Sequence, residues 1–288
     1  MISAPSHAAL PSSRARESLD LLTQAAHRWE HRRPEDDSTV DASLWLRAGR
    51  AAWAAGDGEE AGLWYSRAAE ELLDVALGFG TRTGTYAYYA ELALGCAALS
   101  QRRGTVNRIA DLIRFHPAPP PSRRARGRWA SAAEPVAVAH EALRAWAARL
   151  LGEQRDAAAA TLVATRLAGT LPPRAAQRWS GSHWSLLTTA LEALLDGRAD
   201  RLEETLVSLD RLLAAEAAVA PTCTAAVNET LAALAALWRR TFPRSYAASG
   251  PGAFALAIEP GTGTLLASSG AQSATPAGAA TLPPTGGA

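Results

Sequence analysis

Residues 43–77 read SLWLRAGRAAWAAGDGEEAGLWYSRAAEELLDVAL, and this stretch decides the fold. Two runs rich in alanine and leucine flank Gly56, Asp57 and Gly58, and glycines in such a place are typical of a turn between two helices. Alanine is the strongest helix former. The stretch therefore predicts an αα-hairpin, which is two antiparallel helices joined by a short turn.

The same pattern recurs along the chain. Turn signals separate further helical runs at Gly104, at Gly152 and at Asp196-Gly197, and a last helical run covers residues 221–240. We therefore predict an all-α fold, an irregular bundle or solenoid of antiparallel helical hairpins that spans residues 14–246.

Segments without helical periodicity mark the ends of this domain and one internal break. Residues 1–13 are rich in Ser, Pro and Ala and predict a flexible arm, whereas residues 116–128 hold too much Pro and Arg to continue a helix. Residues 247–288 form a low-complexity tail, which predicts a disordered terminus. Within the tail, a Pro-Gly-Thr-Gly turn in residues 253–267 is consistent with a short β-hairpin.

Charge and composition exclude several functions. The formal net charge is only +1, so we expect neither a nucleic-acid partner nor a membrane partner. The sequence contains no lysine, and all 29 basic residues are arginines. P-loop, protein-kinase and Schiff-base chemistries that depend on a lysine are therefore excluded.

The cysteines and the N-terminal residues bear on the cellular compartment. Cys96 and Cys223 lie far apart in apolar helical runs, so we interpret both as buried free thiols. The first residues lack a basic start followed by a continuous apolar run, and no apolar run has membrane-spanning length. We expect a cytoplasmic protein.

Histidines are the best candidates for a metal site. His27 and His31 lie four residues apart with Glu30 between them, a spacing that can present two imidazoles to one ion. No third ligand is indicated, so we interpret them as exposed helix residues. His140 and His183 are isolated in the sequence, and we expect them at helix surfaces or helix starts. We therefore expect no metal ligands, no cofactor and no catalytic residues.

Two short motifs resemble functional signals without their context. GFGTRTG at residues 78–84 follows a helical run instead of a strand, so we interpret it as a loop between hairpins and not as a phosphate-binding loop. LPPTG at residues 282–286 matches the sorting signal LPxTG, but no apolar span and basic residues follow it. We interpret that match as coincidental.

The first hairpin resembles a tetratricopeptide repeat. The resemblance rests on these residues: Trp45, Gly49, Ala52, Ala61, Tyr65 and Ala68. In that family, small residues let two antiparallel helices approach while aromatic residues fill the space between them. The later hairpins share the size of the repeat but not its residue pattern, so a regular array is not indicated.

A longer resemblance, across about residues 40–240, is to the all-helical immunity protein 49 family of bacterial polymorphic-toxin systems. It rests on the order of these features: Trp45 and Trp53; Tyr88 and Tyr89; RRGTVNRIADLIRF at 102–115; Trp146; and LLTTALEALLDGRADRLEETLVSLDRLL at 186–213. The acidic, aromatic C-terminal stretch of that family has no counterpart in residues 245–263. The resemblance implies a protein that neutralises a toxin by binding it.

We therefore predict a non-catalytic protein-binding module, with a cognate toxin as the sharpest version of the partner. Aromatic and arginine residues are the types that anchor such interfaces. The candidate partner-binding residues are Trp64, Tyr65, Tyr88, Tyr89, Arg123 and Arg124. One alternative is a tetratricopeptide-like scaffold or regulator that binds a peptide, and another is a metal enzyme built inside a helical bundle.

Overall fold

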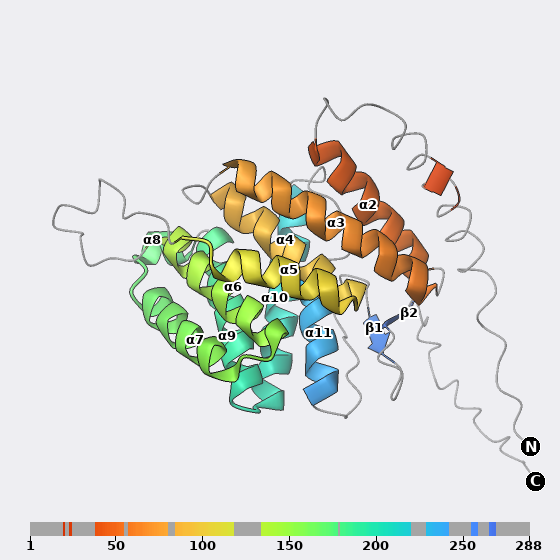
Figure 1. Ribbon diagram of the computed structural model, residues 1–288. Helices are drawn as coiled ribbons and strands as arrows, with labels where there is room; N and C mark the ends of the chain where they lie inside the picture. Colours follow the sequence, from red (N-terminus) through yellow and green to blue (C-terminus); the bar gives the residue numbers. More distant parts are fainter. Residues whose placement is uncertain are drawn as a thin grey trace, which may run out of the picture.

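The computed structural model confirms an all-α fold (Figure 1). It describes residues 20, 23–24, 38–54, 57–79, 84–117, 134–177, 179–219, 229–241, 255–258 and 265–268. None of the helices in these ranges is both long enough and apolar enough to cross a membrane. The N-terminal arm, most of the loop at 116–128 and most of the tail at 247–288 lie outside the described residues.

The deciding stretch folds as the predicted hairpin. Helix α2 (Ser38–Ala54) packs antiparallel to α3 (Gly58–Phe79), and Asp57 lies in the turn between them. A Cβ atom at Gly49 would lie 3.2 Å from the ring of Tyr65, so glycine lets the two helices approach closely at this point. The buried Ala52 and Ala68 are small for the same reason.

The next pair is α4 (Gly84–Ser100) and α5 (Arg103–Arg114), and here the predicted turn is wrong. Gly104 lies in the first turn of α5, whereas the chain reverses at Gln101, which has a left-handed φ of 55°. The Ser100 hydroxyl donates to the Ala97 carbonyl at 2.7 Å and accepts from the Arg102 backbone N–H at 3.2 Å. A serine side chain therefore stabilises a turn that sequence reasoning assigned to the glycine.

Four helices and one short helix form the second half of the domain. They are α6 (Pro135–Leu151), α7 (Gln154–Gly169), α8 (Pro173–Ala176), α9 (Trp179–Leu195) and α10 (Ala199–Val219). Gly152 ends α6 with a φ of 82°, and Gly197 lies between α9 and α10 with a φ of 68°. Both turns are where the sequence predicts them, because glycine adopts this left-handed conformation without strain.

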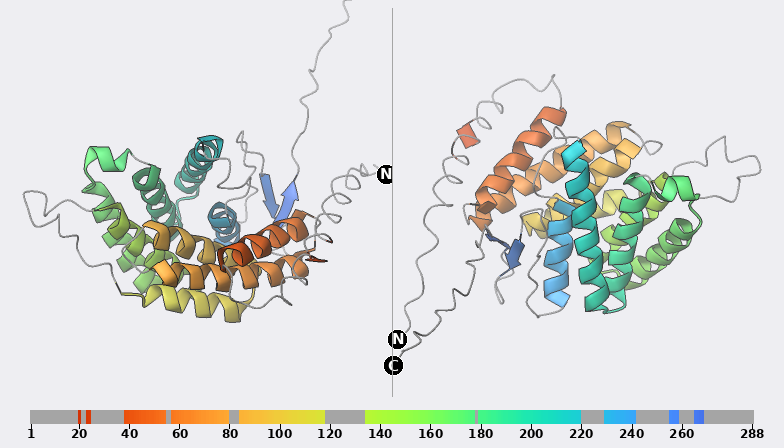
Figure 2. Two further views of the ribbon diagram at one scale, coloured as in Figure 1. Left: turned by 90° about the horizontal axis from the view of Figure 1, so that it is seen from above. Right: turned by 180° about the vertical axis from the view of Figure 1, so that it is seen from behind.

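Helix α11 (Glu229–Thr241) returns to the first half of the chain. It packs against α4 and α10, so the helices follow a curved path and α11 lies on its inner side (Figure 2). Helix α4 contacts α3, α5, α6 and α11, and it is buried on nearly every side. A helix that is apolar all round is expected at the centre of an all-α domain.

Two short strands follow α11. Strand β1 (Ala255–Ile258) pairs antiparallel with β2 (Leu265–Ser268), with Ala255 opposite Ser268. They fall at the segment where the sequence is consistent with a hairpin, and β2 extends one residue beyond it.

Candidate functional site

Three aromatic side chains form an exposed cluster where α3 ends and α4 begins. The rings of Phe79 and Tyr89 are stacked with centroids 5.9 Å apart, and Tyr88 meets Tyr89 edge to face at 5.3 Å. Phe79 is 50% exposed and Tyr88 is 38% exposed. We call Phe79, Tyr88 and Tyr89 the aromatic patch.

The fold explains why these rings meet. Helices α3 and α4 are antiparallel neighbours, so the last residue of α3 lies beside the first turns of α4. Tyr89 is partly buried and packs against the core, so it fixes the positions of the two more exposed rings. Leu77, two residues before the end of α3, adds a further exposed apolar side chain.

The C-terminal end of α5 lies at the same end of the molecule. The buried ring of Tyr86 in α4 meets the His116 ring edge to face at 4.7 Å, which holds the end of α5 beside the start of α4. Phe115 is 70% exposed, and the Arg114 guanidinium lies 4.6 Å from its ring centroid. Exposed aromatic residues from the end of α3, the start of α4 and the residue that follows α5 therefore lie at one end of the domain.

Two of the predicted partner-binding residues belong to the core instead. Trp64 and Tyr65 are buried, and Trp64 stacks on Trp45 with ring centroids 5.3 Å apart. Their placement on α3 turns them towards α2, where they fill the space between the two helices. Arg123 and Arg124 lie outside the described residues, so of the predicted set only Tyr88 and Tyr89 belong to the patch.

The core contains a buried ion pair that sequence reasoning missed. Arg50 of α2 donates two hydrogen bonds to the carboxylate of Glu229 at the start of α11, at 2.6 Å and 2.9 Å. The Glu229 side chain is fully buried. Burial opposes the charge on Arg50, but the neighbouring Glu229 carboxylate outweighs it and raises the pKa of the guanidinium. The pair joins two helices 179 residues apart in sequence.

Two titratable groups close to this ion pair are held neutral. Burial, together with the Glu229 carboxylate, raises the pKa of the Cys96 thiol and of the Tyr65 hydroxyl well above their ordinary values. Because the thiolate is the reactive form of cysteine, Cys96 is an unreactive core residue. This agrees with the prediction that Cys96 is a buried free thiol, while Cys223 lies outside the described residues.

A second buried polar pair joins α4 and α9. The Nε2–H of His183 donates to the Glu91 carboxylate, with both oxygens 2.8 Å away, and the two side chains are almost fully buried. The prediction placed His183 at a helix surface or a helix start, and the surface position is wrong: the residue lies near the start of α9 and is buried. The missed signal is Glu91 itself, because it is the one charged residue in the apolar run from Gly84 to Ser100 and a buried carboxylate needs a partner.

His140 is also a core residue, contrary to the predicted surface position. Burial lowers its pKa to about 4, and the nearby Arg144 and His116 add to that shift. The neutral imidazole is the form that fits an apolar site beside a guanidinium.

The remaining motifs give no further site. Among the described residues, no three His, Cys, Asp or Glu side chains gather as metal ligands. His27 and His31, residues 80–83 of the GFGTRTG motif and the LPPTG motif lie outside those residues. Gly78 and Phe79 belong to α3, and Gly84 begins α4.

No protein-family model, no curated protein and no solved structure matches this chain.

Proposed function

We propose that this chain is a non-catalytic protein-binding module, with the aromatic patch of Phe79, Tyr88 and Tyr89 at the centre of its contact surface. The observation that carries the proposal is the geometry of these rings: Tyr89 contacts both Phe79 and Tyr88, and Phe79 and Tyr88 remain exposed where two packed helices meet. Interfaces are enriched in such aromatic residues, and a few of them supply most of the binding energy.

The arrangement favours binding because the rings are already ordered in the free protein, which lowers the conformational entropy lost on association. Tyr89 is packed against the core, and its contacts hold the other two rings in place before any partner arrives. Few rotamers are then lost on association, and a preorganised aromatic surface gains affinity from that. Phe115 at the same end of the domain can extend the contact area.

The sharpest version of the proposal is a cytoplasmic immunity-type protein that neutralises a cognate toxin by direct binding, and it rests on the resemblance of residues 40–240 to that family. A folded toxin suits an exposed aromatic end of the domain better than a peptide does, because a tetratricopeptide-like peptide site uses the groove between repeats. The enzyme alternative requires polar groups that a substrate can reach. Instead, the core contains two polar pairs: Glu91 pairs with His183, and Arg50 pairs with Glu229.

The test is capture of partners by the full chain from its source organism, followed by reconstitution with the purified partner. The patch variant is Phe79→Ser with Tyr88→Ser, and the matched control is Leu162→Ser with Val163→Ser on α7, where both side chains are also about half exposed. We expect one dominant partner with the unmodified chain and with the control, and affinity at least about tenfold weaker for the patch variant.

Three outcomes decide between the versions. Equal affinity of the patch variant and the control would remove the patch as the contact surface. Recovery of a partner that is toxic when expressed alone, and harmless when co-expressed with this chain, would support the immunity version. Recovery of no partner would contradict the binding module.

A further inference from the structure

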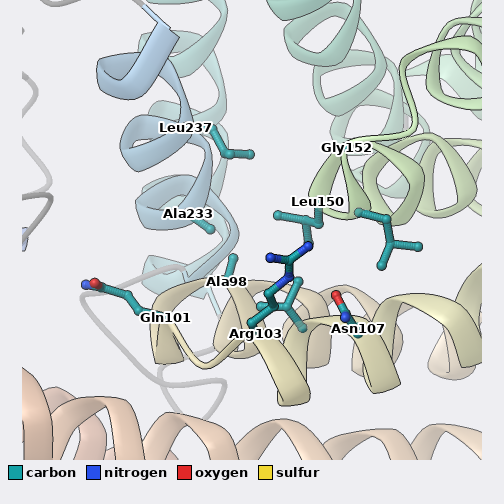
Figure 3. A pocket seen from close by; sticks show the side chains of 10 residues that line it. Ala98, Gln101, Arg103, Asn107, Leu150, Gly152, Ala233 and Leu237 are labelled. Carbon is teal, nitrogen blue, oxygen red and sulfur yellow. The ribbon is translucent and has the colours of Figure 1, made fainter.

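A groove of about 340 Å³ lies at the opposite end of α4 from the aromatic patch (Figure 3). The end of α4, the start of α5, the end of α6 and one face of α11 surround it. Its volume falls within the range of small-molecule sites. Its residues come from four separate segments, so the groove exists only in the folded domain.

The two facing walls of the groove, on α6 and α11, carry apolar side chains. Leu150 and Leu151 of α6 and Leu237 of α11 line them, and all three are only partly buried. Figure 3 shows Leu150 and Leu237 extending towards each other from the two sides of the groove. An alkyl chain placed between them would remove their apolar surface, and its own, from water.

The part of the groove that the α4–α5 turn and the start of α5 form carries polar and positively charged side chains. Arg103 is exposed, and its guanidinium extends into the groove near Leu150 (Figure 3). Asn107 of α5 adds a side-chain amide beside Arg103, and no carboxylate belongs to the lining. No side chain caps the first turn of α5, so its N–H groups add to the positive potential.

We propose that this groove binds a small amphipathic carboxylate of the medium-chain fatty-acid type. The carboxylate accepts two hydrogen bonds from the Arg103 guanidinium, a pairing whose planar geometries match. The alkyl chain lies between Leu150 and Leu237. The charge of the lining selects the anionic head, and the leucines select the apolar chain.

This site is independent of the proposed protein-binding function. Arg103 follows the C-terminal end of α4, whereas Tyr88 and Tyr89 lie near its N-terminal end. Loss of one activity by substitution therefore leaves the other intact, and the two proposals can fail separately.

The test is calorimetric titration of the full-length chain with decanoate below its micelle concentration. We expect saturable binding of one decanoate per chain, and at least about tenfold weaker binding to the Arg103→Ala variant because both charge-assisted hydrogen bonds are lost. Arg166→Ala is the matched control, since Arg166 is an exposed arginine near the C-terminal end of α7 and lies 14 residues after Gly152, the nearest lining residue in that part of the chain. It should bind decanoate as the unmodified chain does.

Two comparison ligands separate the contributions of charge and chain. Decyltrimethylammonium has the same alkyl chain with the opposite charge and should bind at least about tenfold more weakly than decanoate. Octanoate should bind about fourfold more weakly per methylene removed, the amount expected for apolar burial. Absence of saturable binding, equal affinity of Arg103→Ala and the unmodified chain, or equal affinity for the cationic amphiphile would each overturn the proposal.

Discussion

The buried ion pair between Arg50 and Glu229 gives the sharpest stability prediction. The substitution Glu229→Gln keeps the shape of the side chain but removes its charge, and it leaves the Arg50 guanidinium in the core without a counter-ion. Breaking one partner of a buried pair costs about 3–5 kcal/mol. Arg50 keeps 16% of its side chain exposed, so we expect a loss near the lower end, about 3 kcal/mol.

The assay is urea unfolding followed by circular dichroism. The matched control is Glu70→Gln, because Glu70 and Arg108 form an exposed pair 3.3 Å apart, with side chains 43% and 63% exposed. That substitution should cost less than about 1 kcal/mol. A double variant, Arg50→Met with Glu229→Leu, should recover most of the stability, because paired apolar replacements remove the uncompensated charge.

A loss for Glu229→Gln no larger than that for Glu70→Gln would refute this reasoning. It would mean that the ion pair does not hold α11 against α2 and α4, and that apolar packing alone does so.

Three further predictions follow from the core. Gly95→Ala should destabilise by about 1–3 kcal/mol in urea unfolding, because its Cβ would lie 2.9 Å from the backbone of α11, whereas Gly78→Ala meets nothing within 4 Å and should be neutral or stabilising. Glu91→Leu should cost about 1–3 kcal/mol, and more than Glu91→Gln, because only leucine leaves the His183 Nε2–H without an acceptor. Because the folded state holds the pKa of His140 at about 4, below its ordinary 6.5, the unfolded state binds the proton first as the pH falls. Unfolding free energy should therefore decrease between those two pH values by at most about 1.4 kcal/mol per pH unit from this residue, and His140→Gln should reduce that slope.

The sequence predicts most of the secondary structure because the signals for it are local. Alanine-rich periodic runs give the helices, and Gly152 and Asp196-Gly197 give turns that glycine stabilises without help from distant residues. Gly104 fails as a turn because the stabilising interaction comes from Ser100, whose side chain bonds the backbone of its neighbours. When two turn signals lie a few residues apart, composition alone does not show which of them marks the turn.

The candidate site is less predictable because it depends on which helices become neighbours. Aromatic residues in helical runs serve equally well in the core and on the surface, and only the packing of α3 against α2 separates Trp64 from Phe79. The same holds for the buried pair of Glu91 and His183, whose members are 92 residues apart. A lone charge in an apolar helix indicates a buried partner, but it does not identify that partner.

The most direct measurement of the central claim is amide hydrogen exchange of the purified chain with and without its captured partner. Partner binding through the aromatic patch predicts slower exchange concentrated in residues 77–79 and in the first turns of α4, with the exposed face of α7 unchanged. Slower exchange confined to α7 or to α10, with no change where α3 meets α4, would contradict it.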